Sequence, residues 1–430
     1  MKIVGLITEY NPFHNGHLYH IQEAKRITGA DAAVVIMSGD YVQRGVPAIM
    51  PKRLRAEMAL KCGASAVFEL PVCYASGSAE LFAMGAVSFL DRLGIVDCLC
   101  FGSECSDLNI LESIARILVS EPPEYRSCLK EGLKQGLSYP AARQQALGLC
   151  LPSGEHASVL EDPNNILGVE YLKALKRLNS SIKPFTIQRK GAHYHDRTLS
   201  PEHYSSASAI RSLLAYSSSA LRTERPGGTF EETTALSDIL GELEGQVPSS
   251  CLELLKDCHR VLYPVYQNDF SLILKYKLLN KHPASLIRYA DVSEELARRI
   301  SIRLDNFFNY EQFCELLKTR EITRTRINRA LLHIMLGIKK ESIEEYTKQG
   351  FHFYARLLGC RKDSEKLLAR IAKESPLTLL ARISDSSRLP LSAQRMLRND
   401  ILASNLYMSV VTDKYKTAYQ NEYKQALIKV

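Results

Sequence analysis

The chain has 430 residues, enough for two or three domains, and its hydrophobic fraction of 46% and charged fraction of 24% are typical of a soluble globular protein. No apolar run approaches the roughly 20 residues of a membrane-spanning helix, and Lys2, followed at once by a strand pattern, is unlike a signal peptide. The net charge of +8 comes from residues 251–430, which carry 31 Lys+Arg and 20 Asp+Glu, whereas residues 1–250 carry 24 and 27. Such a basic region suits a polyanionic partner, although many basic surfaces are merely solvated.

The first thirty residues predict a strand, a turn and a helix. Residues 3–7 are continuously apolar, as in a buried strand, and Asn11-Pro12 ends that pattern. Apolar residues then recur at helical spacing as far as Gly29, with His14 and His17 at the start of the helix. Unpaired N–H groups and the helix dipole make such an N-terminus a natural phosphate site. We therefore expect nucleoside triphosphate to bind here, with chemistry at its α-phosphate; the alternative is an ordinary turn with surface histidines.

Strand and helix patterns alternate over the next seventy residues. The expected strands are 32–37, 66–71 and 96–101, and the expected helices are 52–62 and 78–93. Continuous apolar strands joined by helices predict a parallel sheet that is covered on both faces. Ligands bind beyond the carboxyl ends of such strands, which here carry residues 8–17, 38–40 and 102–104.

The middle of the chain predicts an extension of the sheet domain and a second phosphate site. Residues 107–183 are mainly helical in pattern, and Asn164 and Asn165 precede one helix, where they are equally well explained as caps. Residues 183–189 alternate like a strand. Residues 205–211 place serines and an arginine at a helix start, which fits either a phosphate site or a serine-capped surface helix.

The last part of the chain predicts helices with almost no strand. Residues 217–250 have the composition of a linker. In the expected helix 322–340 one face is apolar, while Arg326, Arg329, His333 and Lys340 form another face that would contact a nucleic-acid backbone or solvent. The eleven cysteines form no CxxC pair, so we expect free thiols in a reducing cytoplasm rather than a metal site at Cys98, Cys100 and Cys105.

Several motifs together indicate a family. His14-Asn15-Gly16-His17 resembles the HxGH signature of the nucleotidyltransferase and class I aminoacyl-tRNA synthetase superfamily, and residues 205–211 are similar to a second nucleotidyltransferase motif. The series GxITEYNPFHNGHxYH, MSGDYVQRGxPA, PKxxRAEMAL, FELP and FGSE resembles the bacterial tRNA(Met) cytidine acetate ligases more closely. The match is dense over the sheet region and loose over the C-terminal part. The KMSKS-type lysine motif of the synthetases is absent.

Pattern and resemblance together predict an α/β protein. A Rossmann-like parallel sheet nucleotidyltransferase domain with a helical insertion would span residues 1–216, a linker residues 217–250, and an all-helical, basic tRNA-binding region residues 251–430. The resemblance implies these ATP contacts: Ile7, Thr8, Glu9, Tyr10, Asn11, Pro12, Phe13, His14, Asn15, Gly16, His17, Leu18, Tyr19, His20, Gly102, Asn165 and Arg189. Ser206, Ser208 and Arg211 are our candidates for holding the pyrophosphate.

The resemblance also implies a reaction. Acetate would attack the α-phosphorus of ATP to give acetyl-adenylate, and the wobble cytidine of elongator tRNA(Met) would become N4-acetylcytidine with release of AMP. His14 and His17 would donate hydrogen bonds to the phosphates, and Mg²⁺ would screen their charge. Asp40 would bind Mg²⁺ or the cytidine amine, or only hydrogen-bond its own loop.

Two other functions share parts of this pattern. A small-molecule adenylyltransferase would have the HxGH turn and the serine helix but not the long basic C-terminal part. A non-catalytic RNA-binding protein with a retained nucleotide pocket would not need both histidines.

Overall fold

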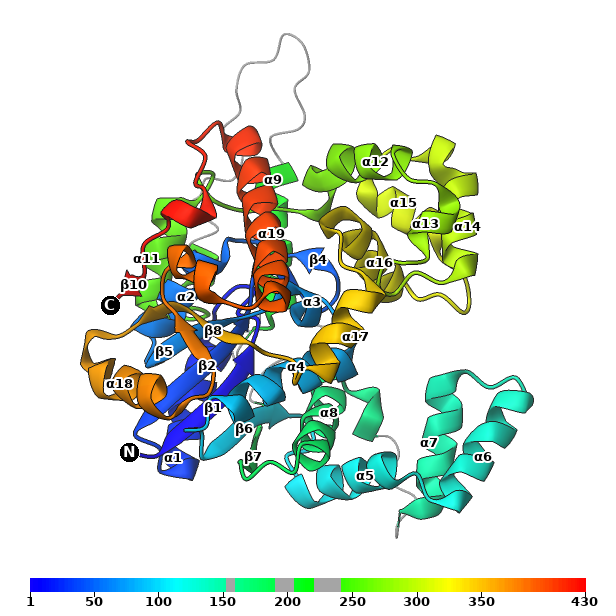
Figure 1. Ribbon diagram of the computed structural model, residues 1–430, viewed down its shortest axis with the longest axis horizontal. Coiled ribbons are helices and arrows are strands. Elements are labelled where there is room, and N and C mark those ends of the chain that lie inside the picture. The colour runs from blue at the N-terminus through cyan, green and yellow to red at the C-terminus, as the bar shows by residue number, and fades with distance from the viewer. Residues whose placement is uncertain (152–158, 190–204, 220–240) are drawn as a thin grey trace.

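The computed structural model describes residues 1–151, 159–189, 205–219 and 241–430 (Figure 1). Its centre is an eight-stranded sheet in the order β10-β8-β5-β2-β1-β6-β7, with β9 paired to β8. The strands of this sheet are β1 (Ile3–Thr8), β2 (Ala32–Ser38), β5 (Ala66–Leu70), β6 (Cys98–Ser103), β7 (Lys183–Gln188), β8 (Tyr354–Cys360), β9 (Thr378–Leu380) and β10 (Ile428–Lys429). A small hairpin consists of β3 (Tyr41–Val42) and β4 (Val46–Pro47).

The five strands from the N-terminal half are parallel, and the parallel sheet was predicted for the first four of them, β1, β2, β5 and β6. β1 lies in the middle and pairs with β2 from Ile3 opposite Ala32 to Thr8 opposite Met37, while its other edge pairs with β6. Every residue of β1 and β2 is buried, which is why their sequences are continuously apolar instead of alternating. The α/β class expected from the sequence is confirmed.

Helices surround this sheet and occur along the whole described part of the chain. They are α1 (Asn15–Thr28), α2 (Lys52–Lys61), α3 (Val72–Ala75), α4 (Ala79–Arg92), α5 (Leu108–Ser120), α6 (Pro123–Lys134), α7 (Tyr139–Cys150), α8 (Pro163–Arg177), α9 (Ala207–Ser219), α11 (Ser249–Cys258), α12 (Ser271–Leu279), α13 (Pro283–Leu286), α14 (Glu294–Arg303), α15 (Tyr310–Leu317), α16 (Arg324–Leu336), α17 (Lys340–Lys348), α18 (Glu365–Glu374) and α19 (Leu391–Tyr415).

The two faces of the sheet form two apolar clusters. Val4 and Leu6 of β1 pack in a cluster with residues of α1, α2, α9 and α11. Ile3 and Ile7, which point the other way, belong to a larger cluster that includes residues of α4, α8 and α19. The first cluster therefore joins α1 to α9 and α11, which come from distant parts of the chain.

The prediction of almost no strand in residues 251–430 is wrong. β8 joins the edge of the sheet antiparallel to β5, and β9 and β10 both pair with β8. β8 contains Arg356 and Gly359, so its sequence is not the continuous apolar run by which the other buried strands were recognised. Gly359 allows close packing, because a Cβ there would come within 2.7 Å of Leu60 and Ile428.

Two groups of helices project from the sheet on the same side of the molecule (Figure 1). The mainly helical insertion predicted for residues 107–183 is present as α5–α8, in which α6 and α7 form a hairpin. Above it in Figure 1 lies a lobe that contains α12–α16. Both chain ends lie on the opposite side, at the left of the picture.

Candidate active site

The turn between β1 and α1 orders the two motif histidines through backbone hydrogen bonds. His14 is the N-cap of α1, and its Nδ1 accepts a hydrogen bond from the Gly16 N–H at 3.1 Å. His17 Nδ1 in turn accepts from the His14 N–H at 3.3 Å, and the two ring centroids are 3.8 Å apart. A neutral imidazole that accepts at Nδ1 carries its proton on Nε2. The two rings are therefore neighbouring hydrogen-bond donors.

Their surroundings keep these rings uncharged at neutral pH. Burial, followed by the charges of Arg189 and Arg211, lowers the pKa of His14 from 6.5 to about 3. Burial and the adjacent His14 lower the pKa of His17 well below its ordinary value. Burial likewise lowers the pKa of His20 to about 4, although the hydrogen bond to the Cys100 carbonyl acts in the opposite direction. A phosphate at this turn would thus meet neutral N–H donors and nearby guanidinium cations.

Aromatic side chains pack against His17 from the protein core. Tyr10 has φ of 50°, in the left-handed region, and its ring is fully buried. It contacts His17 edge-on at 4.9 Å between ring centroids, and Phe13 lies 5.5 Å from His17. Of the predicted ATP contacts, Tyr10 and Phe13 therefore support the turn with side chains that lie in the core, whereas His17 is partly exposed.

A buried arginine fixes the ends of β1 and β2. The sequence motifs did not predict a role for it. Arg55 of α2 is fully buried and donates hydrogen bonds to carbonyls at the ends of two neighbouring strands. Its Nη1 lies 2.5 Å from the Glu9 oxygen and 3.2 Å from the Ser38 oxygen, and its Nη2 donates to Gly39. The arginine of the PKxxRAEMAL motif thus shapes the rim on which the histidine turn lies.

The serine helix lies directly against the histidine turn, as the sequence predicted for a second phosphate site. Arg211 Nη1 donates to the Asn11 carbonyl at 2.6 Å, and its Nη2 donates to Ser208 Oγ at 2.9 Å. Ser206 Oγ accepts from the Ala209 N–H at 3.1 Å and so caps the helix. The structure brings these three candidate residues to the start of α1.

A turn that the sequence assigned to the linker completes this arrangement. The Gln246 carbonyl accepts from the Asn15 N–H at 3.0 Å, and the Gly245 carbonyl accepts from Asn15 Nδ2 at 2.6 Å. Gln246 Oε1 accepts from the Ser205 N–H at 3.0 Å. Gln246 therefore joins the histidine turn to the serine helix. Residues 220–240 of the predicted linker lie outside the described residues, but Gly245 and Gln246 contact the candidate site.

The end of β6 forms the neighbouring wall. Arg189 packs its side chain over Gly102, where an added Cβ would lie 3.1 Å from Arg189 Cγ, and donates to Asn164 Oδ1 at 3.3 Å. Asn165 is 1% exposed, and its Oδ1 accepts from the N–H groups of Glu104 and Cys105 at 2.9 and 3.2 Å. Asn165 thus fixes the loop after β6 from inside the protein, whereas the side chain of Arg189 is exposed to solvent.

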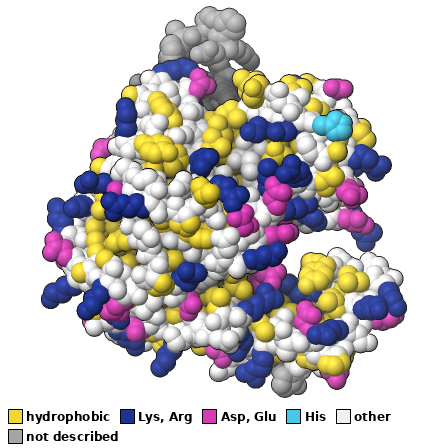
Figure 2. Space-filling view, viewed as in Figure 1, with side chains coloured by type: hydrophobic (Ala, Val, Ile, Leu, Met, Phe, Trp, Pro, Cys, Tyr) yellow, Lys and Arg dark blue, Asp and Glu magenta, His cyan; other side chains and the backbone are white. Residues whose placement is uncertain are grey.

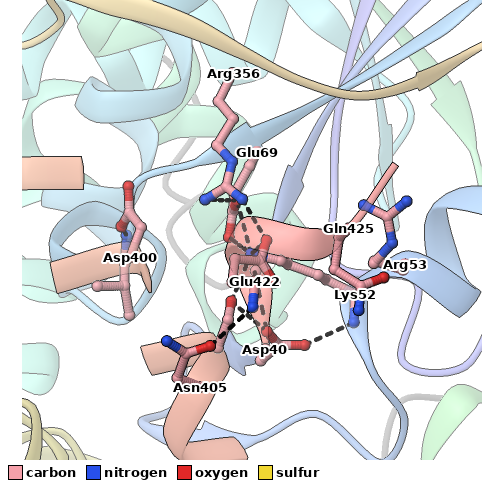
Figure 3. A network of polar contacts seen from close by, with 12 residues as sticks. Asp40, Lys52, Arg53, Glu69, Arg356, Asp400, Asn405, Glu422 and Gln425 are labelled. Carbon is pink, nitrogen blue, oxygen red and sulfur yellow. Dashed lines mark hydrogen bonds and ion pairs between the residues drawn. The ribbon is translucent and has the colours of Figure 1, made fainter. Parts of the chain in front are cut away.

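Asp40 belongs to a different group, a buried network of charges shown in Figure 3. Its Oδ1 accepts from the Lys52 N–H at 2.7 Å and its Oδ2 from Ser404 Oγ at 2.8 Å. Of the three roles expected for Asp40, hydrogen bonding that fixes the loop is the one present. Both carboxylate oxygens are engaged and the residue is 4% exposed, so Asp40 does not fit a Mg²⁺ ligand.

Lys52 lies at the centre of this network and links the N-terminal motifs to the end of the chain. Its Nζ is 2.7 Å from Glu69 Oε1, 2.9 Å from Glu422 Oε1 and 2.5 Å from Ser404 Oγ. Arg356 of β8 pairs with both glutamates, at 3.0 Å for Glu69. The lysine of PKxxRAEMAL and the glutamate of FELP therefore fasten β8, α19 and the C-terminal segment to the sheet (Figure 3).

The basic face expected on the helix 322–340 is largely covered. His333 of α16 is 1% exposed, and its ring nitrogens lie 3.2 Å from the Ala290 carbonyl and 3.1 Å from Ser76. Arg329 forms a bidentate pair with Asp291 at 3.0 and 3.1 Å. Arg326 is exposed. Lys340 Nζ donates to the Val292 carbonyl at 2.8 Å. The interpretation of Arg326, Arg329, His333 and Lys340 as one exposed face is therefore wrong, because His333 is buried and Arg329 and Lys340 have partners within the fold.

Within the described ranges, no group of three or more His, Cys, Asp or Glu residues could hold a metal ion. All eleven cysteines are free. No helix in that same part of the chain is long and apolar enough to span a bilayer.

Comparison with known proteins agrees with this geometry. Residues 1–423 match the family model described as HIGH Nucleotidyl Transferase. A protein of Acetivibrio thermocellus named tRNA(Met) cytidine acetate ligase is 40% identical, and the match covers 100% of both chains. One with the same name from Thermoanaerobacter sp. is 41% identical over 98% of this chain and 96% of its own. The chain belongs to the tRNA(Met) cytidine acetate ligase family.

Solved structures support the assignment of this family. The crystal structure of Thermotoga maritima TmcAL in an apo form is 31% identical and superimposes with a TM-score of 0.88 over 100% of both chains. A second form, bound with alpha-thio ATP, gives 30% identity and a TM-score of 0.85 with the same coverage. The likeness to the Thermotoga maritima protein thus covers the whole chain and not only the HxGH domain.

Proposed function

We propose that this enzyme activates acetate with ATP to acetyl-adenylate and transfers the acetyl group to the wobble cytidine of elongator tRNA(Met). The observation that carries the proposal is the pair of neutral histidines at the start of α1, with Arg211 and Arg189 beside them. The names of the full-length relatives support the acceptor and the acetyl donor. The alpha-thio ATP bound by the Thermotoga maritima protein supports the nucleotide.

In the first half-reaction an acetate oxygen attacks the α-phosphorus of ATP, and pyrophosphate leaves in line. Negative charge develops on phosphate oxygens, so catalysis consists of positioning and electrostatic stabilisation. The Nε2–H groups of His14 and His17 donate to the α-phosphate. Because these rings are already neutral and fixed through Nδ1, they need no proton transfer or rotation during the reaction.

The leaving pyrophosphate is held on the other side of the turn. Arg211 is fixed by Asn11 and Ser208, and the exposed Arg189 supplies a second guanidinium. The capped N-terminus of α9 adds backbone N–H groups. These cations and dipoles take the place of the synthetases' missing lysine motif. In this proposal Mg²⁺ would be held by the triphosphate and would screen its charge, since both carboxylate oxygens of Asp40 are engaged elsewhere.

In the second half-reaction the cytidine amine attacks the acetyl carbonyl, a C–N bond forms, and AMP departs with the oxygen of the mixed anhydride. The amine is a weak nucleophile because its lone pair is delocalised into the ring. Activation of acetate as an anhydride compensates for this weakness, so no coenzyme A is needed.

The direct test is to incubate the protein with ATP, labelled acetate and unmodified tRNA(Met), and to follow AMP and acetylated cytidine. Formation of both supports the proposal. Adenylylation of a phosphorylated metabolite without use of acetate would instead identify a small-molecule adenylyltransferase. Absence of any ATP turnover would identify a non-catalytic RNA-binding protein.

A further inference from the structure

The helix α12 exposes an apolar stripe to solvent. Leu272, Tyr276 and Leu279 recur at i, i+4 and i+7, on one side of the helix, and are 80%, 67% and 64% exposed. The opposite side is well packed, because Leu274 and Leu278 are at most 2% exposed and α12 contacts α16. The helix is therefore firmly seated, and its outward apolar face is available for a partner.

A second exposed ring lies beside this stripe. Phe308 is 81% exposed, and the residues on either side of it are tied to α12. Lys275 Nζ donates to the Phe307 carbonyl at 3.1 Å, and Ser271 Oγ accepts from the Tyr310 N–H at 3.0 Å. Phe308 is thus held next to the first turn of α12, although its own ring is open to solvent.

The segment that carries the stripe contains only basic charged residues, although the exposed Glu311 lies near its start, where Glu311 accepts a hydrogen bond from Asn268 at 2.8 Å. Residues 270–290 contain Lys275, Lys277, Lys281 and Arg288 and no acidic residue. The acidic residues at the two ends of this segment are neutralised within the fold, since Asp269 pairs with Lys414 at 2.7 Å and Asp291 with Arg329. Figure 2 shows hydrophobic and basic side chains intermixed over the lobe that contains α12, with acidic side chains at the edges of that lobe.

We propose that this α12 face, formed by Leu272, Tyr276, Leu279 and Phe308 with the lysines of α12, binds the tRNA substrate. The inference rests on the proposed function. Lysines attract the phosphate backbone, and exposed aromatic rings stack on unpaired bases such as those of tRNA loops. Residues 270–290 contain no carboxylate that would repel a polyanion. A protein partner would not require such a segment to be free of carboxylates, so their absence favours a polyanion. The tRNA surface therefore lies on α12 and not on the covered face of α16.

The test compares two Tyr-Lys pairs. The variant Tyr276→Ser with Lys277→Glu changes the α12 face, and Tyr423→Ser with Lys424→Glu makes the same change at a 61% exposed tyrosine near the C-terminus. Filter binding measures the affinity of each full-length chain for elongator tRNA(Met) at several salt concentrations. We expect the α12 variant to bind at least tenfold more weakly, with a shallower salt dependence, and the control pair to bind within about twofold of the wild type.

Three further measurements separate the outcomes. Thermal unfolding of the α12 variant within about 2 °C of the wild type excludes a folding defect, since all changed residues are on the surface. Unchanged tRNA affinity, or equal loss in both variants, would overturn the inference. So would sedimentation of the wild type as a dimer and of the α12 variant as a monomer, which would make the face a self-association surface. Acetate-dependent pyrophosphate–ATP exchange is measured on the wild type as an independent assay. Absence of exchange would overturn the proposed function and not the inference about α12.

Discussion

Two groups of motif residues in this protein differ in the way they use their polar atoms. The histidines at the start of α1 use Nδ1 to fix themselves on the backbone, and this geometry leaves Nε2–H for a ligand. In the network around Lys52, the carboxylates of Asp40, Glu69 and Glu422 are buried together with the cations of Lys52 and Arg356 that pair with them. The first arrangement suits chemistry, and the second joins distant parts of the chain. Residues of one family signature therefore serve two separate purposes.

The difference predicts where substitution will damage the fold. Replacement of Lys52 by methionine leaves Asp40, Glu69 and Glu422 buried with fewer cations, so we expect the free energy of unfolding to fall by about 3–5 kcal/mol. Lys61→Met on the same helix is the control, because Lys61 is 32% exposed and pairs only with Glu57 at 3.4 Å. The control should change stability by no more than about 0.5 kcal/mol. Urea denaturation measures both, and equal effects would contradict the structural role of Lys52.

The histidine turn should show the opposite behaviour. His17→Ala removes one fixed donor, so we expect acetate-dependent pyrophosphate–ATP exchange to slow by roughly 10²–10³-fold, with tRNA binding retained. His20→Ala should cost less, because His20 Nε2 already donates to the Cys100 carbonyl at 3.2 Å. Loss of tRNA binding together with exchange in His17→Ala would mean that the histidine is structural.

Gln246 differs from both the histidines and Lys52, since it would act on the nucleotide indirectly, by holding the histidine turn against the serine helix. Gln246→Leu leaves the buried Ser205 N–H without the Oε1 acceptor, which costs about 1–3 kcal/mol, and should raise the KM for ATP by roughly tenfold. Gln246→Glu keeps an acceptor oxygen at that position and should restore most of the affinity. An unchanged KM in Gln246→Leu would show that the turn does not position the nucleotide.

The smallest effect concerns stability at low pH. The pKa of His14 falls from 6.5 in the unfolded chain to about 3 in the folded one because of burial and nearby arginines, so the folded state binds fewer protons between these values. The free energy of unfolding therefore falls as the pH drops below 6.5, by about 1.4 kcal/mol per pH unit from this group. In His14→Asn the slope between about pH 6 and 4.5 should be shallower by that amount. Parallel curves for the two proteins would contradict the shift.

The sequence predicted the parallel strands and the histidine turn because both follow from local pattern. The sequence pattern did not predict β8, because Arg356 is a charged residue within it. The burial of Arg356 depends on ion pairs with Glu69 and Glu422, which are more than sixty residues away along the chain. The sequence pattern misjudged α16, because periodicity identifies a helix face but not the segment that covers it; the partners of His333 come from Ser76 and Ala290. Gln246 gave no signal, because its carbonyl and its Oε1 accept from the backbone N–H groups of Asn15 and Ser205, and almost every residue has such a group.

The central claim, that His14 and His17 are neutral Nε2–H donors to the α-phosphate, is best tested by NMR of ¹⁵N-histidine-labelled protein. We expect both rings to show protonated Nε2 and unprotonated Nδ1 at neutral pH, because burial lowers the pKa of both rings, and we expect His14, with a pKa of about 3, to keep this state down to about pH 5. Addition of a non-hydrolysable ATP analogue should shift both Nε2 resonances. Protonation of Nδ1 in either ring, titration near pH 6.5, or resonances unchanged by the nucleotide would contradict the account.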